Sequence, residues 1–136
     1  MEESQNNDKP ILGFQGQYLW LSNFIGGVEQ RYQAAKFTSQ EDVDRVLAMS
    51  PADAKRYGRR AKLDANWSEV RLTIMENAVR QKMESEPYKS MLLATGERHI
   101  EEANYWGDCF WGTFNGVGDN NLGKIIMKIR DEMKGR

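Results

Sequence analysis

Hydrophobic and polar residues alternate along most of the chain with the period of an α-helix. The longest apolar stripe runs through Val70, Ile74 and Ala78, which share one helix face because of their spacing. Ser50 followed by Pro51 is typical of a helix start, since serine caps the first turn and proline fits its first position. The predicted helices span residues 28–38, 41–49, 51–58, 68–83, 88–94 and 121–133.

Two further stretches favour extended backbone. Residues 11–21 are rich in aromatic side chains with glycine and glutamine between them, which predicts a small N-terminal β-hairpin or two irregular strands. Residues 97–102 predict a short strand. We therefore expect an α+β protein, mostly helical, with a disordered N-terminal tail over residues 1–9 and a single compact domain over residues 10–136.

Length and composition narrow the class of protein. The chain has 136 residues, of which 40% are hydrophobic, and this is enough for one core. Its net charge of −1 argues against a protein that coats nucleic acid through bulk electrostatics. One cysteine, Cys109, and one histidine, His99, are too few for an internal disulfide or a zinc site. Carboxylates alone could still hold magnesium, but no spaced aspartate cluster indicates such a site, and we expect no metal and no cofactor.

The N-terminal residues are polar and acidic and lack the apolar core of a signal peptide. With a lone cysteine, this pattern predicts a cytoplasmic protein that does not associate with membranes. Nothing in the sequence indicates an obligate protein partner.

Glu29 and Lys36 are candidates for chemistry on the first predicted helix. They are seven residues apart, so both side chains project from nearly the same face, about 10 Å apart along the axis. Gln33 lies between them on this face. The spacing suits a carboxylate and an amine that hold opposite sides of a small polar ligand. It is also typical of the solvated face of a surface helix, which is the commoner meaning of such a pattern.

A cluster of cations surrounds Gly58. Five lie within eight residues: Lys55, Arg56, Arg59, Arg60 and Lys62. Such a cluster suits phosphate, because guanidinium groups match its oxygens. It is as typical of an ordinary helix end, where the macrodipole favours positive charge.

Residues 105–121 form a long predicted loop, and loops of this length in compact domains are usually functional. Residues 105–114 hold five aromatic side chains in ten residues, which either stack on nucleobases or pack in the core. Residues 116–123 run into the last helix, so their backbone amides could hold a phosphate at its N-terminus. Their polar side chains could equally be ordinary caps of that helix.

Taken in order, six blocks of residues resemble the NADAR superfamily, also called YbiA-like. The blocks are residues 21–24, Glu29 with residues 32–37, residues 57–59, 66–67, 105–108 and 116–123. The resemblance extends over residues 14–131, and six ordered blocks are more specific than any one of them. Gln30 stands where many members have histidine, and Val28 after two glycines replaces the usual lead-in.

The resemblance implies a small, mostly helical α+β fold and N-glycosidase activity on ribosyl N-glycosidic bonds. Members cleave phosphorylated ribosylamino-pyrimidine intermediates of riboflavin synthesis, or remove ADP-ribose from guanine in DNA. By resemblance, Glu29 and Lys36 are the essential carboxylate and amine, and Lys36 attacks the opened sugar to form a Schiff base. Asp108 is implied as a further catalytic acid.

We expect this chain to remove ADP-ribose from guanine in DNA or nucleotides, so its partners are an ADP-ribose or ribosyl-nucleotide substrate and ADP-ribosylated DNA. The riboflavin intermediates are the alternative substrates. A non-catalytic module that binds ADP-ribose or another NAD derivative is the alternative function. The predicted substrate-binding residues are Trp20, Ser22, Asn23, Phe24, Gln33, Gly58, Arg59, Trp67, Tyr105, Trp106, Trp111, Gly118, Asn120 and Gly123.

Overall fold

The computed structural model describes residues 8–135, and these are mostly helical with a few two-residue strands. They form two compact units. The central unit comprises residues 21–82, and the terminal unit comprises the segments before and after it. Nearly all of the tail predicted over residues 1–9 lies outside the described residues.

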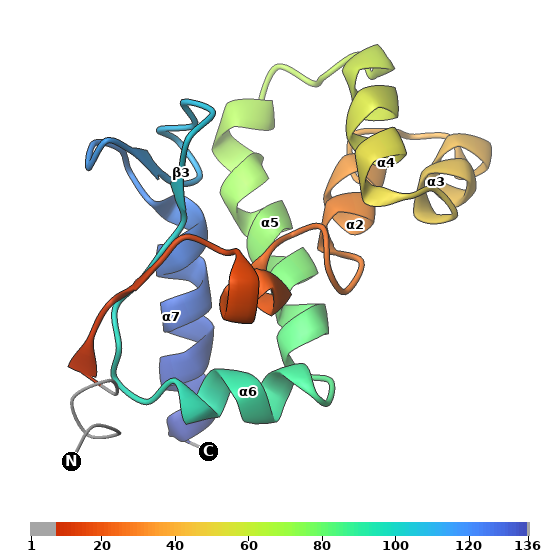
Figure 1. The fold of residues 1–136 in the computed structure, drawn as a ribbon. Coiled ribbons are helices and arrows are strands. Elements are labelled where there is room, and N and C mark those ends of the chain that lie inside the picture. Colours follow the sequence, from red (N-terminus) through yellow and green to blue (C-terminus); the bar gives the residue numbers. More distant parts are fainter. Residues whose placement is uncertain (1–7, 136) are drawn as a thin grey trace. The chain divides into compact units, whose positions relative to one another are not determined.

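The central unit is helical throughout its described elements. Its elements are α2 (Val28–Ala34), α3 (Gln40–Leu47), α4 (Pro51–Tyr57), the 3-10 helix η2 (Gly58–Arg60) and α5 (Trp67–Met83), whose last residue belongs to the terminal unit. Helices α2, α3 and α4 pack on one another around buried Ala34, Val46 and Ala54 (Figure 1). Ser50 accepts a hydrogen bond from the amide of Asp53, which confirms the predicted start of α4.

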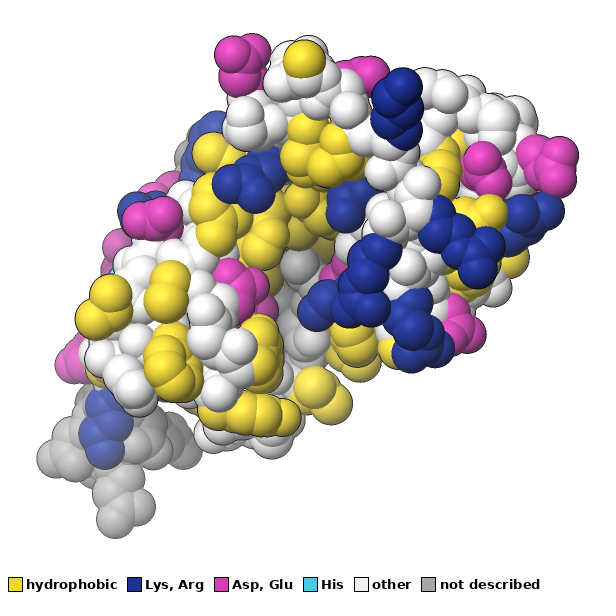
Figure 2. All heavy atoms as spheres, turned by 90° about the horizontal axis from the view of Figure 1, so that it is seen from above, with side chains coloured by type: hydrophobic (Ala, Val, Ile, Leu, Met, Phe, Trp, Pro, Cys, Tyr) yellow, Lys and Arg dark blue, Asp and Glu magenta, His cyan; other side chains and the backbone are white. Residues whose placement is uncertain are grey.

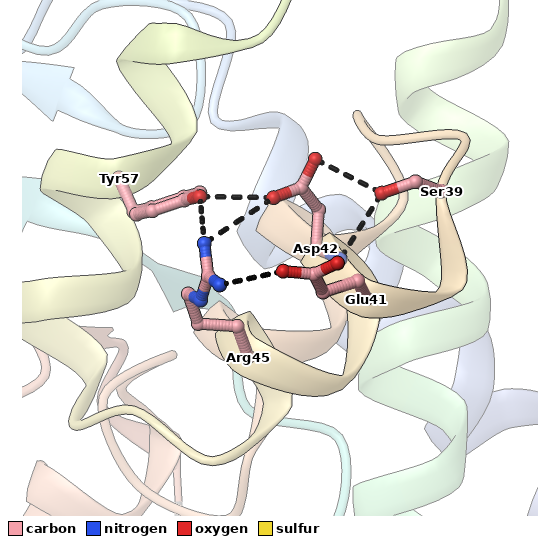
Figure 3. Close-up of polar contacts among 5 residues, drawn as sticks. All are labelled: Ser39, Glu41, Asp42, Arg45 and Tyr57. Carbon is pink, nitrogen blue, oxygen red and sulfur yellow. Dashed lines mark hydrogen bonds and ion pairs between the residues drawn. The ribbon is translucent and has the colours of Figure 1, made fainter.

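A polar network joins α3 to α4 (Figure 3). The hydroxyl of Tyr57 donates to Asp42 at 2.9 Å and accepts from Arg45 at 2.9 Å. Asp42 also accepts from the hydroxyl of Ser39, whose oxygen caps α3, and Arg45 donates to Glu41. The network fixes the end of α4, and with it the position of the next residue, Gly58.

The terminal unit contains the short strands. Its elements are β1 (Ile11–Leu12), the 3-10 helix η1 (Gly16–Leu21), α6 (Tyr88–Ala94), β2 (Ile100–Glu101), β3 (Ala103–Asn104), β4 (Thr113–Phe114) and α7 (Asn121–Lys134), with Leu21 belonging to the central unit. Strand β1 pairs in parallel with β2, and β3 pairs in parallel with β4. Helix α6 packs against α7 (Figure 1).

The predicted N-terminal β-hairpin is wrong. Ile11 is fully buried and pairs with Ile100, far along the chain, so β1 is stabilised by a distant strand and not by its sequence neighbours. Gly13 and Gly16 both have positive φ, which turns the chain out of the strand and into η1. The short strand predicted within 97–102 is confirmed as β2.

The last helix supplies much of the core of the terminal unit. Leu122, Ile125, Ile126 and Ile129 are all buried, as the pattern predicted. The guanidinium of buried Arg130 donates to the Thr95 hydroxyl and the Arg98 carbonyl. In the long helix α5 the buried positions are Met75, Ala78, Val79, Lys82 and Met83, whereas Val70 and Ile74 of the predicted stripe are only half-buried.

Candidate active site

Two glycines place Glu29 at the start of α2. Gly26 and Gly27 have φ of 84° and 82°, a left-handed conformation that glycine adopts without strain. The turn that they form brings the amide of Glu29 to the carbonyl of Asn23, at 3.0 Å. Glu29 is therefore fixed to the 22–27 loop at the first turn of the helix.

A buried lysine and a half-buried arginine donate hydrogen bonds to backbone carbonyls of the same loop. The ammonium of Lys82 donates to the carbonyl of Ser22 at 3.0 Å, and its side chain is 3% exposed. Arg31 donates to the carbonyls of Gly26 and Ala78, each at 3.0 Å. Burial, reinforced by the charge of Arg31, lowers the pKa of Lys82 to about 7. Lys82 was not predicted as a site residue. Its spacing from Ala78 and Val79, one turn earlier on the apolar face of the helix, indicated that it would be buried.

The carboxylate of Glu29 is buried, with only 7% of the residue exposed. It accepts a hydrogen bond of 2.6 Å from the side-chain amide of Gln33, one turn further along α2. Burial raises the pKa of Glu29, while the hydrogen bond from Gln33 and the positive charges of Lys55 and Lys36 act in the opposite direction. The result is a carboxyl group suited to exchanging a proton closer to neutral pH than an ordinary glutamate.

Gly58 provides the space for the amide of Gln33. It has an ordinary helical φ of −57°, so the backbone does not require glycine there. A Cβ at Gly58 would lie 1.9 Å from Oε1 of Gln33, which is closer than any real contact. That Oε1 atom is buried and has no hydrogen-bond partner among the described residues.

Lys36 lies just beyond the helix, and not within it as predicted. Helix α2 ends at Ala34, and the Lys36 amide donates to the carbonyl of Gln33, so the backbone continues for one further turn. The Lys36 ammonium lies 5.4 Å from the ring centroid of Tyr32 and 5.6 Å from that of Trp67. Burial lowers the pKa of Lys36, and the charge of Glu29 partly opposes this effect.

The two aromatic rings beside Lys36 also contact each other. The centroids of Tyr32 and Trp67 are 5.6 Å apart, with their planes tilted by 57°. Burial raises the pKa of Tyr32 to about 12, so its hydroxyl stays protonated at neutral pH. The structure thus brings together five residues singled out by the sequence: Glu29, Gln33, Lys36, Gly58 and Trp67.

The loop before α2 uses several of its polar groups internally. Ser22 Oγ accepts from the amide of Phe24 at 3.1 Å, and the side-chain amide of Asn23 contacts the Met75 sulfur at 3.6 Å. Phe24 is 41% exposed, and the ammonium of Lys55 lies 5.9 Å from its ring centroid. The roles of these three loop residues in sugar binding remain predictions.

The cations of residues 55–62 are all exposed, and Figure 2 shows Lys and Arg side chains gathered on the face seen there. Three of them have neighbours: Arg56 pairs with Asp53, Arg60 lies over the Tyr57 ring, and Lys55 lies over Phe24. Arg59 forms no hydrogen bond or ion pair with any described residue. Its guanidinium is available for an anionic group of a ligand.

The predicted loop of the terminal unit uses its polar groups to hold itself together. Asp108 Oδ1 accepts from the amides of Phe110 and Trp111, at 3.0 and 2.9 Å. Asn104 donates to the carbonyl of Asp108 at 2.9 Å and accepts from its amide at 3.0 Å. These bonds give Asp108 a structural role, and its catalytic role stays a prediction.

Several backbone amides of the predicted phosphate cradle before α7 are already engaged, and phosphate binding there stays a prediction. The four amides from Asp119 to Leu122 already donate to carbonyls of the preceding loop, at 2.8 to 3.2 Å. Asn120 is buried, donates to the Ile100 carbonyl and accepts from the Glu102 amide. A Cβ at Gly123 would collide with Asn120, and one at Gly118 would lie 2.4 Å from the Gly112 carbonyl. The local reason for these glycines is therefore packing.

The aromatic side chains of this loop differ in exposure. Tyr105 and Trp106 are 81% and 57% exposed and contact each other edge to face. Trp111 is half-buried against Phe110, and Trp20 is also half-buried. Cys109 is exposed. Two exposed rings are a surface on which a base could stack, and this role is still a prediction.

Within residues 8–135 no cluster of three or more His, Cys, Asp or Glu side chains could hold a metal ion. None of the helices in this described part is long and apolar enough to cross a membrane.

The chain matches the family model described as the NADAR domain over residues 17–134. It is 37% identical over 115 residues to the N-glycosidase YbiA of Shigella boydii, a match that covers 77% of this chain and 68% of that protein. It is 35% identical over 111 residues to a riboflavin biosynthesis protein of Vibrio vulnificus, covering 78% of this chain and 30% of that protein. The chain therefore spans less than a third of the Vibrio relative.

Among solved structures, the fold is similar to the NMR structure of the Escherichia coli protein YbiA. The TM-score is 0.82 at 28% sequence identity, with 93% of this chain and 86% of that chain covered. This likeness confirms the prediction of a mostly helical α+β fold.

Proposed function

The chain belongs to the NADAR domain family, and we propose that it is an N-glycosidase that hydrolyses a ribosyl N-glycosidic bond through Glu29 and Lys36. One observation carries this proposal. A buried carboxyl and a half-buried amine lie close enough to influence each other's pKa, and burial moves both pKa values toward neutrality. Opposite groups with perturbed pKa values are typical of sites of proton transfer.

Cleavage of a ribosyl C1–N bond builds positive charge on the sugar and negative charge on the leaving base. A carboxylate beside C1 stabilises the first, and a proton delivered to the base nitrogen neutralises the second. Glu29 can serve either purpose, and its raised pKa favours proton transfer relative to an ordinary glutamate. Attack of water at C1 then completes the hydrolysis.

Lys36 offers a covalent route for the same hydrolysis. When the ribose ring of the glycoside opens, the ring oxygen takes a proton and C1 is joined to the base nitrogen as an imine. The neutral amine of Lys36 adds to C1, its proton passes to the base nitrogen, and the C1–N bond to the base breaks, which releases the base and leaves an imine between C1 and Lys36. A later water hydrolyses the imine and regenerates the amine and the free sugar. The lowered pKa increases the share of neutral amine relative to an exposed lysine, and the rings of Tyr32 and Trp67 position the side chain.

ADP-ribose linked to guanine is the proposed substrate. The exposed guanidinium of Arg59 suits its phosphates, and the ring of Trp67 suits a base. A phosphorylated ribosylamino-pyrimidine is the second candidate. The name of the Vibrio relative and the near-neutral charge of this chain favour such a small metabolite.

The test is chromatographic detection of base release from guanine-ADP-ribosylated DNA and from a phosphorylated ribosylamino-pyrimidine. We expect wild type to release a base from the DNA, and Lys36→Ala and Glu29→Gln to lose at least 100-fold in rate, as is typical for a lost acid–base or nucleophilic group. Lys124→Ala, at an exposed lysine of α7, is the matched control.

Reduction with borohydride during turnover should attach the sugar covalently to Lys36, which mass spectrometry of peptides would locate. Release from the pyrimidine alone would replace the proposed substrate with the second candidate. Full activity in both variants would contradict the assignment of Glu29 and Lys36. Tight binding of ADP-ribose by calorimetry, with no release from either substrate, would identify a binding module.

A further inference from the structure

Gln33 occupies an unusual position next to Glu29. The residue is only 4% exposed, and its Nε2 donates to the Glu29 carboxylate at 2.6 Å. Its other end, Oε1, is buried without a hydrogen-bond partner among the described residues. A buried carbonyl oxygen normally has a partner, because leaving it unpaired is unfavourable. Oε1 of Gln33 is therefore an acceptor that the described residues leave unused, directly beside the Glu29 carboxyl group.

The position of Gln33 Oε1 leaves no room for a side chain larger than glycine at residue 58. The backbone of Gly58 is helical and would accept alanine without strain, yet a Cβ there would lie 1.9 Å from Oε1. The amide of Gly58 donates to carbonyls of its own helix and so offers nothing to Gln33. The end of the Gln33 side chain thus lies against a surface that favours neither its oxygen nor its nitrogen.

We propose that Gln33 is a positioning residue that lets Glu29 act in turn as proton acceptor and proton donor, by presenting either end of its buried amide to the carboxyl group. With Nε2 toward Glu29 the amide donates to the carboxylate. Rotated by half a turn, it presents Oε1, which accepts from the protonated acid. Either state leaves one amide end against Gly58, so the amide can rotate as Glu29 gains and loses its proton. This inference rests on the proposed function, in which Glu29 exchanges a proton during each turnover.

Other charged groups act on Glu29 from each neighbouring segment. Lys55 of α4 and Lys36 after α2 both lower its pKa. Tyr32 of α2 interacts with Glu29 and with Arg71 of α5. Each of these charged groups can favour only one protonation state of Glu29, whereas an amide can donate to the carboxylate or accept from the protonated acid. Gln33 is the neighbour that can form a hydrogen bond with either protonation state, and among the groups that lower the pKa of Glu29 its effect is the largest.

The experiment follows the Glu29 carboxyl by carbon-13 NMR of protein labelled at glutamate, with Glu29→Gln used to assign its signal. In Gln33→Met the hydrogen bond to the carboxylate is lost, so we expect the pKa of Glu29 to rise. We expect kcat to fall about tenfold or more with KM nearly unchanged. The acid limb of the kcat profile should move to higher pH.

Two further variants separate this role from a merely structural one. Gln30→Met is the matched control, because Gln30 lies on the same helix, donates to the Met49 carbonyl and also has a buried unpaired Oε1. Gly58→Ala leaves Gln33 chemically intact and fills the space around Oε1. We expect Gly58→Ala to behave like Gln33→Met and Gln30→Met to behave like wild type. Because Gly58→Ala adds a single methyl group to helical backbone, it keeps the test open if Gln33→Met does not fold.

Three results would overturn the inference: an unchanged Glu29 pKa in both Gln33→Met and Gly58→Ala, a uniform fall in kcat with no shift of the pH profile, or an equal shift in Gln30→Met. None of these results would contradict the proposed glycosidase activity of the wild-type protein. Conversely, a shifted pKa in a protein that releases no base from any substrate would count against the proposed function alone.

Discussion

Glu29 in the central unit and Asp108 in the terminal unit are both carboxylates beside glycine-rich turns, but their surroundings differ. Asp108 accepts from two backbone amides of its own loop, and Asn104 holds the backbone of Asp108 from the other side. Glu29 is buried, has its pKa raised by burial and is held by an amide whose other end is unpaired. This difference in partners and burial supports the catalytic role proposed for Glu29 and a structural role for Asp108, although both residues are carboxylates.

The proposed difference between Glu29 and Asp108 is tested most directly by replacing each carboxylate with its amide. Glu29→Gln removes the titrating group but keeps the shape, and we expect kcat/KM for base release to fall at least 100-fold. Asp108→Asn keeps an Oδ1 acceptor for the amides of Phe110 and Trp111, so we expect less than about a threefold change. Steady-state kinetics on the substrate that wild type cleaves gives both numbers.

A large loss in Asp108→Asn, with thermal stability intact, would give Asp108 the catalytic role that the resemblance implies. The comparison between the two carboxylates would then fail, and the hydrogen bonds of Asp108 would be support for a reacting group. Circular dichroism melts of both variants are the control for folding.

Local patterns were enough to predict the helices, because their caps and spacing are encoded in neighbouring residues. Helix α6 and the start of α4 are examples, with Ser50 as the cap of α4. Strand β1 could not be predicted, because its partner Ile100 lies far along the chain. A two-residue strand carries no period of its own, so its pairing is decided by tertiary packing.

The site was predictable in part. Spacing alone placed Glu29, Gln33 and Lys36 near one another, although α2 ends before Lys36. Spacing could not show that Gly58 faces Gln33, since that contact depends on how α4 packs against α2. For residues 116–123, the sequence could not reveal that the amides from Asp119 to Leu122 are already engaged by the preceding loop.

The stability of the terminal unit should depend on the hydrogen bonds of Asn120, which is the structural role that we contrast with Glu29. Asn120 and Asn115 both have left-handed backbone, with φ of 51° and 53°, but only Asn120 is buried and bonded to Ile100 and Glu102. We expect Asn120→Ala to lower the free energy of unfolding by about 3 kcal/mol, from two lost hydrogen bonds and backbone strain. Asn115→Ala should lose only about 1 kcal/mol, from strain alone. Urea unfolding measures both, and equal losses would mean that the side-chain bonds of Asn120 contribute nothing.

The last prediction is a pH slope and concerns the buried charge that holds the 22–27 loop. Lys82 has a pKa of about 7 in the folded protein and about 10.5 when exposed, so between these values the unfolded chain binds more protons than the folded one. Stability should therefore rise with pH from about 7 toward 10, by at most about 1.4 kcal/mol per pH unit. The raised pKa of Tyr32 acts in the opposite direction only above about pH 10, where that hydroxyl ionises in the unfolded chain.

In Lys82→Met the apolar stem remains and the titrating group is gone, so the slope of unfolding free energy against pH should flatten between pH 7 and 9.5. Lys124→Met, at an exposed lysine of the terminal unit, should keep the wild-type slope. If wild type and Lys82→Met show the same slope, the central unit does not hold a destabilised buried cation, and the contrast between the two units is confined to Glu29.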